Sequence, residues 1–434
     1  MTRLAATALL VAACNGQNAT INLDLTTAPG STLLASVTHL RLSLIEHDVV
    51  VDTMQNASGG FDISISLTAE GDGDQLVLEG FDAGENLIAT GASPPFLLSP
   101  TEAHIVIYVA PPMSIGAAPV TLPPARTGIS GVILPYGALF AGGRDAGGAP
   151  SDAVSVYNDY DHTLAMGMAN PIKRADFAIA ATALNGVLLI GGTGVDGMPV
   201  STVQLFDTTV QPAGAYITIG EQPTFARAGE IAVPIGNDHF LLTGSPPAEY
   251  AGGQLAARSE IAFLPNVGAT VVPTDGIRTS VFVGDTGIIR FRADHFDTLA
   301  ATGRARAAIT DLPATGKLVI AGGGTATVPT ADVLLVDPST GAIEVHANLL
   351  VTPRFSPAIA ATARYVVIAG GTDAADVPIA TAEILDGTTL APIAILPMAA
   401  RAKPLAFRMS NGQVLIAGGS PATDLLELFT PPPP

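Results

Sequence analysis

Seven arginines recur at similar intervals along the last three-quarters of the chain and are its strongest candidates for binding chemistry. They are Arg126, Arg174, Arg227, Arg278, Arg306, Arg354 and Arg401. A guanidinium group donates paired hydrogen bonds to a carboxylate, so a ring of arginines could bind carboxylates, acidic sugars or an acidic peptide. The alternative is that each arginine binds carbonyls and aspartates of its own or the next repeat. We favour this packing role, because residues that recur in every repeat first serve the contacts between repeats.

Cys14, the single cysteine, is a candidate for chemical modification. One cysteine excludes internal disulfides and cysteine-based zinc sites. Residues 1–13 carry one positive charge and then a short apolar run, which predicts a secretory leader too brief to span a bilayer. The stretch Leu10-Val11-Ala12-Ala13-Cys14 resembles the bacterial lipobox, which implies that Cys14 receives lipid, including palmitate, and becomes the mature N-terminus. An ordinary leader with a chance cysteine is the alternative.

Catalytic and metal-binding patterns are sparse. The seven histidines show no pair at ligand spacing, and no nucleophile elbow or phosphate-binding loop is present. The turn Glu70-Gly71-Asp72-Gly73-Asp74 could offer oxygen ligands to Ca²⁺. It lacks the rest of a calcium loop, so we interpret it as a solvated turn. The sequence therefore predicts no metal, no cofactor and no enzymatic activity.

Composition limits the partners and the fold. The chain has 38 acidic and 19 basic residues, which argues against binding the phosphate backbone of nucleic acid. No basic amphipathic stretch is present, so the only membrane attachment we expect is the lipid. Charged residues make up only 13%, beside 46 glycines and 34 prolines. This composition favours short strands joined by tight turns, and hence an all-β fold.

The arginines are the first feature of a sequence repeat. The second feature is an apolar run that ends in two glycines. These pairs follow an arginine by 16 or 17 residues: Gly142-Gly143, Gly191-Gly192, Gly322-Gly323, Gly370-Gly371 and Gly418-Gly419. A strand that is apolar on both faces needs cover on both sides. Glycine suits a strand end where φ is positive or another backbone passes close. A polar residue that ends the next strand is the third feature, as at Asn158, Asp207, Asp337 and Asp386. One unit therefore predicts four antiparallel strands in about 48 residues, stacked around an axis.

This repeat resembles the kelch repeat over residues 117–430, through its apolar strand ending in Gly-Gly and the arginine that precedes it. The resemblance implies a β-propeller whose arginines lie in the loops entering the inner strands, at the mouth of the central channel. The chain departs from the family in lacking tryptophan and the usual tyrosine after the glycine pair. Blade packing must then depend on Leu, Val, Ile and Phe.

Kelch propellers include galactose-oxidase-like enzymes, whose copper sites are similar to a set of two histidines, two tyrosines and a cysteine cross-linked to one tyrosine. Cys14 lies in the leader and cannot supply that cross-link. A carbohydrate-active enzyme, such as a sugar oxidase or an epimerase-like protein with its site at the channel mouth, remains the alternative function.

The number of blades depends on the short interval between Arg278 and Arg306. It holds three predicted strands, at residues 279–283, 287–293 and 296–301. We expect seven blades, and six blades with an inserted hairpin are the alternative. The last repeat ends after its third strand, so residues near 117–123 should supply the fourth and leave no open edge. Residues 431–434 are expected to be a tail without a structural role.

The residues before the propeller predict a small separate domain. Residues 14–20 are a polar tether, and residues 20–113 contain seven short strands separated by turns, which is typical of a small β-sandwich. This region loosely resembles the small domains that follow the lipid anchor in many bacterial surface lipoproteins. The boundary falls between Pro111-Pro112 and Pro123-Pro124.

Together these features predict a non-catalytic, lipid-anchored, monomeric protein of the bacterial cell envelope, at the outer membrane and facing the periplasm or the surface. Its propeller loops would bind another envelope protein or a polysaccharide. Long irregular stretches at residues 144–152, 193–201 and 245–259 are the expected contact loops. A purely structural spacer is a third possible role.

Overall fold

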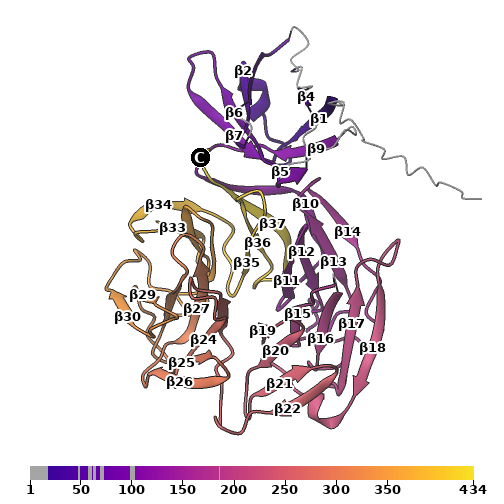
Figure 1. Cartoon of the computed structure of the whole chain (residues 1–434), viewed down its shortest axis with the longest axis vertical. Helices are drawn as coiled ribbons and strands as arrows, with labels where there is room; N and C mark the ends of the chain where they lie inside the picture. The colour runs from indigo at the N-terminus through magenta and orange to yellow at the C-terminus, as the bar shows by residue number, and fades with distance from the viewer. Residues whose placement is uncertain are drawn as a thin grey trace, which may run out of the picture.

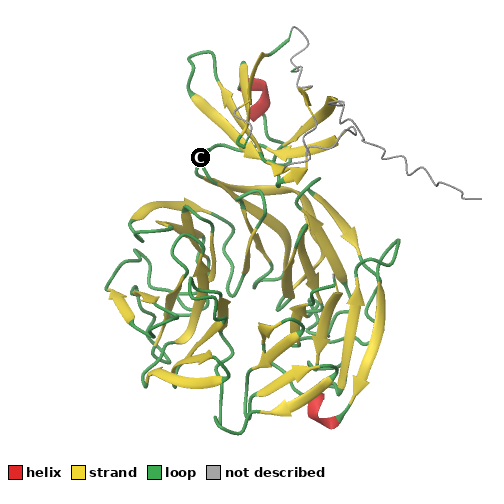
Figure 2. Cartoon of the chain, in the orientation of Figure 1, coloured by secondary structure: helices red, strands yellow, loops and turns green. Residues whose placement is uncertain are grey.

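The computed structural model of this chain describes residues 18–46, 49–56, 61, 65–68, 73–97, 103–184 and 186–434. They form a small N-terminal sheet region and a large wheel of sheets, as Figure 1 shows. Strands dominate both parts, and Figure 2 draws a short helix in each. These helices are α1 (Leu33–Ser36) and the 3₁₀ helix η1 (Pro223–Phe225). The expectation of an all-β chain is confirmed.

Two principal sheets in the N-terminal region share one core. One sheet has the order β4-β1-β9 and the other β3-β2-β6-β7, while β5 and β8 form a two-stranded pair. Apolar side chains such as Leu40, Leu78 and Ile107 pack together between the two principal sheets. The strands are β1 (Asn18–Thr26), β2 (His39–Leu44), β3 (Val49–Met54), β4 (Ile65–Thr68), β5 (Gly73–Asp74), β6 (Leu76–Phe81), β7 (Leu87–Ala92), β8 (Phe96–Leu97) and β9 (Ala103–Tyr108).

Seven four-stranded antiparallel sheets follow, and their arrangement is consistent with a seven-bladed propeller. We number the sheets, here called blades, in chain order from β11. The first strands are β11 (Ser130–Leu134), β15 (Ala178–Ala181), β19 (Ala232–Gly236), β23 (Gly268–Val271), β27 (Ala305–Leu312), β31 (Ala358–Ala361) and β35 (Leu405–Arg408). The second strands are β12 (Gly137–Ala141), β16 (Gly186–Ile190), β20 (His239–Leu242), β24 (Thr279–Gly284), β28 (Lys317–Gly324), β32 (Tyr365–Ala369) and β36 (Val414–Ala417).

The third and fourth strands complete each blade. The third strands are β13 (Val154–Asn158), β17 (Thr202–Asp207), β21 (Ala248–Ala251), β25 (Gly287–Arg292), β29 (Val333–Val336), β33 (Thr381–Asp386) and β37 (Thr423–Thr430). The fourth strands are β14 (Thr163–Met166), β18 (Ala215–Glu221), β22 (Gln254–Ala257), β26 (His295–Ala300), β30 (Ile343–His346), β34 (Pro392–Pro397) and β10 (Ser114–Arg126). The expectation of one long irregular loop over residues 245–259 is therefore wrong, because those residues include β21 and β22.

The strand order explains the apolar pattern of the sequence. The second strands β12, β16, β32 and β36 are buried along their whole length, because each is flanked within its sheet and covered on both faces. The fourth strands β14, β18, β22 and β34 are mostly exposed at the rim of the wheel. A run of apolar residues is therefore needed only in the strand that is packed on both sides.

The wheel is closed by a strand from its N-terminal side. β10 pairs antiparallel with β37, with Ser114 opposite Thr430 and Gly116 opposite Leu428. The prediction that residues near 117–123 complete the last blade is confirmed. The first strands of neighbouring blades contact one another in sequence, and β11 also contacts β35. Through this pairing β37 is not left as an exposed edge strand of the last blade.

Apolar clusters lie between every pair of neighbouring blades. Val319 of β28 packs with Ile368 of β32 between blades 5 and 6. Phe140 and Leu415 pack between blades 1 and 7. The remaining clusters join blades 1 and 2, 2 and 3, 3 and 4, 4 and 5, and 6 and 7. Aliphatic residues and phenylalanine thus fill the interfaces of a chain without tryptophan.

The wheel has two different sides. One side, here called the hairpin face, carries the connections from second to third strands and from each blade to the next. The opposite side, the turn face, carries the other two sets of connections, which are mostly tight turns. The N-terminal region lies against the turn face, where the amide of Tyr108 meets His162 and Tyr160 reaches the carbonyl of Pro95.

The C-terminal prolines also lie beside the N-terminal region. Arg364 Nη1 donates a hydrogen bond of 2.8 Å to the carbonyl of Pro433, and residues 430–434 line a cavity with β6 and β7. Residues 431–434, expected to be a tail, therefore contact the rest of the described chain.

Candidate functional site

The repeated glycine pairs bring adjacent blades into close contact on the hairpin face. Gly370 has φ of 58°, and a Cβ there would lie 2.7 Å from the carbonyl oxygen of Arg401 in the next blade. Gly371 has φ of 94°, and its Cβ would lie 2.5 Å from the carbonyl oxygen of Phe355. Both reasons expected for glycine therefore operate here, because φ is positive and another backbone passes too close for a side chain.

Buried arginines fasten the strand ends beside these glycines. Arg354 Nη1 donates to the carbonyls of Gly370 at 3.0 Å and Thr381 at 3.1 Å. Arg401 Nη1 does the same with Gly418 at 3.2 Å and Leu425 at 3.1 Å. One guanidinium group thus satisfies the carbonyl of the first glycine and a carbonyl near the start of the third strand. We call this arrangement the arginine clasp.

The same clasp occurs in blades 1 and 2. Arg126 Nη1 donates to Gly142 at 2.7 Å and to Ala153 at 3.0 Å. Arg174 Nη1 donates to Gly191 at 2.9 Å and to Thr202 at 3.2 Å. Arg126, Arg174, Arg354 and Arg401 are at most 1% exposed. Burial lowers the pKa of Arg126 and of Arg174 to about 10, and it also lowers the pKa of Arg354 and Arg401.

A second residue of the clasp was not identified from the sequence. Arg354 Nη2 donates to Glu383 Oε1 at 2.5 Å, and Arg401 Nη2 donates to Glu427 Oε2 at 2.6 Å. In blade 2 the equivalent partner is Gln204, 2.7 Å from Arg174 Nη2. The sequence feature that could have identified this residue is a carboxylate or amide side chain inside an otherwise apolar strand, as in Ala382-Glu383-Ile384-Leu385.

Blade 1 has a shorter residue at this partner position. Ser155 is opposite Phe140, as Gln204 is opposite Leu189, and its hydroxyl contacts Met166 Sδ. Among the described residues, Arg126 Nη2 is buried without a hydrogen-bond partner. The serine is too short to take the place of the glutamine or glutamate.

The remaining three predicted arginines lie in other environments. Arg227 bonds to Glu230 and, through Nη2, to the carbonyls of Thr243 at 3.1 Å and Pro246 at 2.6 Å. It therefore fastens blade 3 with a different acidic partner.

Arg278 was assigned to the wrong phase of the repeat. Blade 4 begins at β23, so Arg278 lies between the first and second strands of that blade, near the turn face. Leu264 occupies the arginine position instead: the amide of Gly244 donates to its carbonyl at 2.9 Å, as the amide of Gly371 donates to Arg401. The three strands predicted between Arg278 and Arg306 are present, and β23 was missed.

Arg304, and not Arg306, is the residue of blade 5 that is equivalent to the clasp arginines. Arg306 follows that position by two residues. Residues two after each repeat arginine have positive φ, and Arg306, with φ of 58°, is one of them. The set is Gly128, Asp176, Gly229, Arg306, Ser356 and Lys403. A Cβ on Gly323 would meet the carbonyl of Ala305, just as one on Gly371 meets Phe355. The predicted phase of Arg306 is therefore wrong.

Arg306 instead joins blade 5 to the hairpin of blade 6. Its Nη2 donates to Asp376 Oδ1 at 2.6 Å and to the hydroxyl of Thr372 at 3.0 Å, and its guanidinium lies 4.4 Å from the ring centre of Phe355. That any of the seven predicted arginines binds a ligand stays a prediction.

The hairpins between second and third strands expose apolar side chains at a repeated position, directly before a proline. Met198 is 63% exposed, Val328 61% and Val377 54%, in blades 2, 5 and 6. The backbone of each hairpin is closed internally, since the carbonyls of Met198, Val328 and Val377 accept amide hydrogen bonds from within the same hairpin. Asp145 and Asp373 accept further amide bonds inside their hairpins. The hairpin backbones are thus hydrogen-bonded internally, while the side chains of Met198, Val328 and Val377 are mostly exposed.

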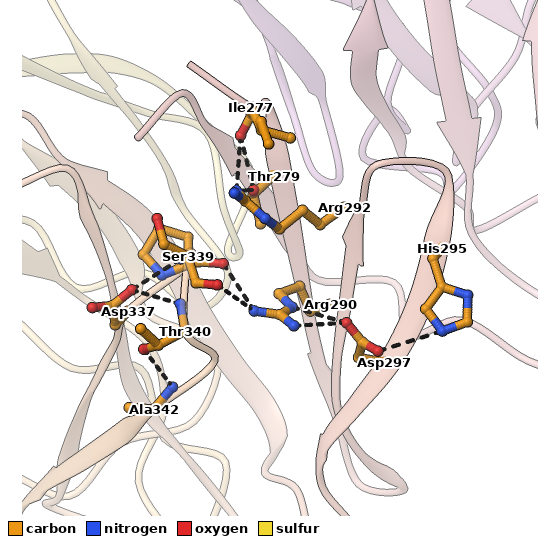
Figure 3. Close-up of polar contacts among 11 residues, drawn as sticks. Ile277, Thr279, Arg290, Arg292, His295, Asp297, Asp337, Ser339, Thr340 and Ala342 are labelled. Atoms are coloured by element: carbon orange, nitrogen blue, oxygen red, sulfur yellow. Dashed lines mark hydrogen bonds and ion pairs between the residues drawn. The ribbon is translucent and has the colours of Figure 1, made fainter. Parts of the chain in front are cut away.

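Blade 4 lacks both the glycine pair and the arginine, and it is fastened through its third strand β25, as Figure 3 shows. Arg290 donates to Asp297 Oδ2 at 2.7 Å and, across the blade boundary, to the carbonyls of Pro338 and Ser339. Arg292 donates to the carbonyl of Ile277 and the hydroxyl of Thr279. These contacts lie toward the turn face and leave the hairpin face of blade 4 unfastened by a clasp.

Three of the cavities on the described chain lie between neighbouring parts of the fold. One of about 610 Å³ lies on the hairpin face between blades 4 and 5. One of about 490 Å³ lies between the outer parts of blades 1 and 2, on the turn face. One of about 250 Å³ lies between the N-terminal region and blades 6 and 7.

A buried polar cluster joins the N-terminal region to the wheel. The amide of Tyr108 donates to His162 Nε2 at 3.2 Å, so the proton of the neutral ring is on Nδ1, which donates to the Tyr157 hydroxyl at 2.7 Å. Burial lowers the pKa of His162 to about 4, although Asp161 opposes this shift. Nearby, Asp159 accepts from the amide and hydroxyl of Ser410, and burial raises its pKa.

Several sequence-based expectations fall outside the described residues. These are the leader, Cys14 with most of the tether, and residues 70–72 of the acidic turn. In the part of the chain that is described, no three His, Cys, Asp or Glu side chains are grouped so that they could hold a metal ion. None of the helices described is long and apolar enough to cross a lipid bilayer.

Comparison with known proteins does not place the chain in a family. No protein-family model matches it, and no curated protein does so either.

Proposed function

We propose that this chain is a non-catalytic recognition protein of the bacterial envelope, in which a kelch-type propeller binds a protein or a polysaccharide through its hairpin face. The kelch assignment is supported by the Gly-Gly strand ends and the arginines that clasp them. Lipid attachment at Cys14 is supported by the lipobox-like stretch that precedes it. A short N-terminal region would then lie between the lipid and the wheel.

The observation that carries this proposal is that the hairpin face has two sets of residues with different environments. Arginines and glycines that recur are occupied in fastening strands, whereas Met198, Val328 and Val377 are exposed at the tips of hairpins. An apolar side chain that is mostly exposed is available to a partner. Loops held on a rigid scaffold are the usual place for such contacts.

The test compares two triple variants of the full chain. Met198→Ser, Val328→Ser and Val377→Ser together remove the hairpin tips, while Ile217→Ser, Val345→Ser and Ile395→Ser remove similarly exposed apolar residues from fourth strands. Both proteins are cross-linked to envelope extracts and applied to a glycan array. We expect the hairpin variant to lose its partner and the strand variant to keep it. Retention by the hairpin variant would contradict the proposal.

Lipid attachment is tested separately with labelled palmitate in cells. The wild-type chain should take up label, and Cys14→Ala should not. Equal labelling of the two proteins would reject the lipoprotein assignment without affecting the recognition proposal.

A further inference from the structure

Blade 4 has a much shorter connection on the hairpin face than blade 5. There β24 and β25 are joined by the two residues Asp285 and Thr286, whereas residues 325–332 join β28 to β29 in blade 5. The cavity of about 610 Å³ occupies the space beside this short turn. Its walls are Asp285, the blade connection 301–304 and the blade 5 hairpin 324–330.

Arg304 lines this cavity and differs from the arginines of the complete clasps. In the described chain it makes one hydrogen bond, from Nη1 to the carbonyl of Asp332 at 2.6 Å, and an ion pair of 3.7 Å with the same residue. The partner position held by Glu383 in blade 6 is Leu334 in blade 5, opposite Ile320. The Arg304 side chain is 12% exposed. Guanidinium donors that bind Glu383 in the case of Arg354 therefore remain available to a ligand at Arg304.

The cavity walls mix hydrogen-bond donors with acceptors. Thr325 and Thr330 accept amide hydrogen bonds from Val328 and Asp332, and each hydroxyl keeps a proton that it can donate. Thr302 is exposed at the rim and adds a third hydroxyl. Asp285 supplies an exposed carboxylate acceptor from the other side.

The charges disfavour an anionic ligand. The positive charge of Arg304 is already countered by Asp332, and Asp285 adds a second negative charge to the cavity. A ligand rich in hydroxyl groups can both donate to the carboxylate and accept from the guanidinium and threonine groups. The volume is within the roughly 300–1,000 Å³ of pockets that hold small ligands.

We propose that this cavity is a glycan subsite that binds a neutral oligosaccharide between blades 4 and 5. The proposal rests on the recognition function above and adds a ligand class and a position. It also gives the shortened turn of blade 4 a role, because a full hairpin at Asp285 would occupy the same space.

The experiment screens the purified full chain against an immobilised array of neutral, uronic-acid and amino-sugar oligosaccharides, followed by titration of the best-bound sugar. Ala326→Trp should fill the cavity, and Asp285→Asn should remove its carboxylate. The matched control is Ala146→Trp, because Ala146 follows the first glycine of its pair by four residues, as Ala326 does, and is also exposed. We expect neutral sugars to bind, and both cavity variants to lose roughly tenfold or more in affinity. The control should stay within about twofold.

Three results would overturn the proposal. They are full binding by both cavity variants, equal losses in Ala326→Trp and Ala146→Trp, and preference for uronic acids over neutral sugars. Thermal unfolding of each variant shows whether a loss reflects folding. If no sugar binds but the hairpin tips still capture an envelope protein, this inference fails and the recognition proposal stands. Because Val328 also lines the cavity, the double variant Met198→Ser and Val377→Ser separates the two proposals: if it leaves all binding unchanged, the recognition proposal fails independently.

Discussion

The arginine clasp makes a quantitative prediction about stability. In blade 6 the Glu383 carboxylate accepts from Arg354 Nη2 and from the amides of Val351 and Thr352, at 2.7 and 3.0 Å for the two amides. The side chains of Arg354 and Glu383 are 0% and 4% exposed. The pair is therefore a buried ion pair that also satisfies two backbone donors of the connection between blades.

Replacing Glu383 with leucine would leave the guanidinium charge and both amides without this acceptor. Breaking a buried pair by removing one partner costs about 3–5 kcal/mol, because an uncompensated charge stays buried. Glu383→Gln keeps an oxygen acceptor and loses only the charge, and blade 2 uses glutamine at this position in Gln204. We expect the glutamine variant to lose about 1–2 kcal/mol, the cost of weakening a charge-assisted hydrogen bond.

The assay is urea unfolding followed by far-ultraviolet circular dichroism, since the chain has no tryptophan for fluorescence. The midpoint should fall in the order wild type, Glu383→Gln, Glu383→Leu. A matched control is Glu344→Leu, because Glu344 lies on the exposed strand β30 with a side chain 63% exposed. If Glu383→Leu unfolds at the wild-type midpoint, the clasp does not fasten the blades and the packing role of Arg354 is wrong.

Three further predictions use other parts of the wheel. Because burial lowers the pKa of His162 from 6.5 to about 4, its contribution to stability is present above pH 6.5 and falls by about 3 kcal/mol as the pH drops to 4. Unfolding measured from pH 7.5 to 4.5 should show a smaller loss in His162→Asn, and parallel curves would reject this role. Gly370→Ala should destabilise by more than the roughly 1–2 kcal/mol of left-handed strain expected for Gly148→Ala, which meets no atom within 4 Å; equal thermal shifts would contradict the close approach. Arg290→Met should lower the thermal midpoint more than Arg41→Met, whose ion pair is more exposed, and similar midpoints would argue against fastening of blade 4 by Arg290.

The sequence predicted the architecture well because its strongest markers are backbone requirements. A double glycine at a strand end indicates a positive φ and a nearby carbonyl, as at Gly370 and Gly371, and both exclude a side chain at the glycine itself. The closing strand was predictable for a similar reason, since the last repeat visibly lacked one strand and a closed wheel must have it. The first strand of blade 4, β23, could not be located, because that blade has neither the glycines nor the arginine.

The candidate site was harder to predict, because a shift of two residues along the repeat changes which arginine holds the clasp position. Arg306 precedes Gly322 by 16 residues and fits the spacing of the repeat, whereas Arg304 precedes it by 18; the positive φ of Arg306 shows that Arg304 holds the clasp position. Glu383 and Glu427 were missed because a carboxylate in an apolar strand has meaning only when its partner is known. The cavity between blades 4 and 5 depends on a hairpin that is absent from one blade, which no repeated marker reports.

Blade 4 connects these observations. Residues that repeat along the ring have a structural role that the blades share, such as fastening strand ends. Their hydrogen-bonding groups are used in that role and are not free to bind a ligand. A pocket that opens at only one place on a ring of similar sheets must come from a place where the similarity fails. In blade 4 the clasp arginine is replaced by Leu264, fastening passes to Arg290 on the turn face, and the hairpin contracts to Asp285 and Thr286. The loss of fastening on the hairpin face and the gain of an open cavity there are two consequences of the same departure from the repeat.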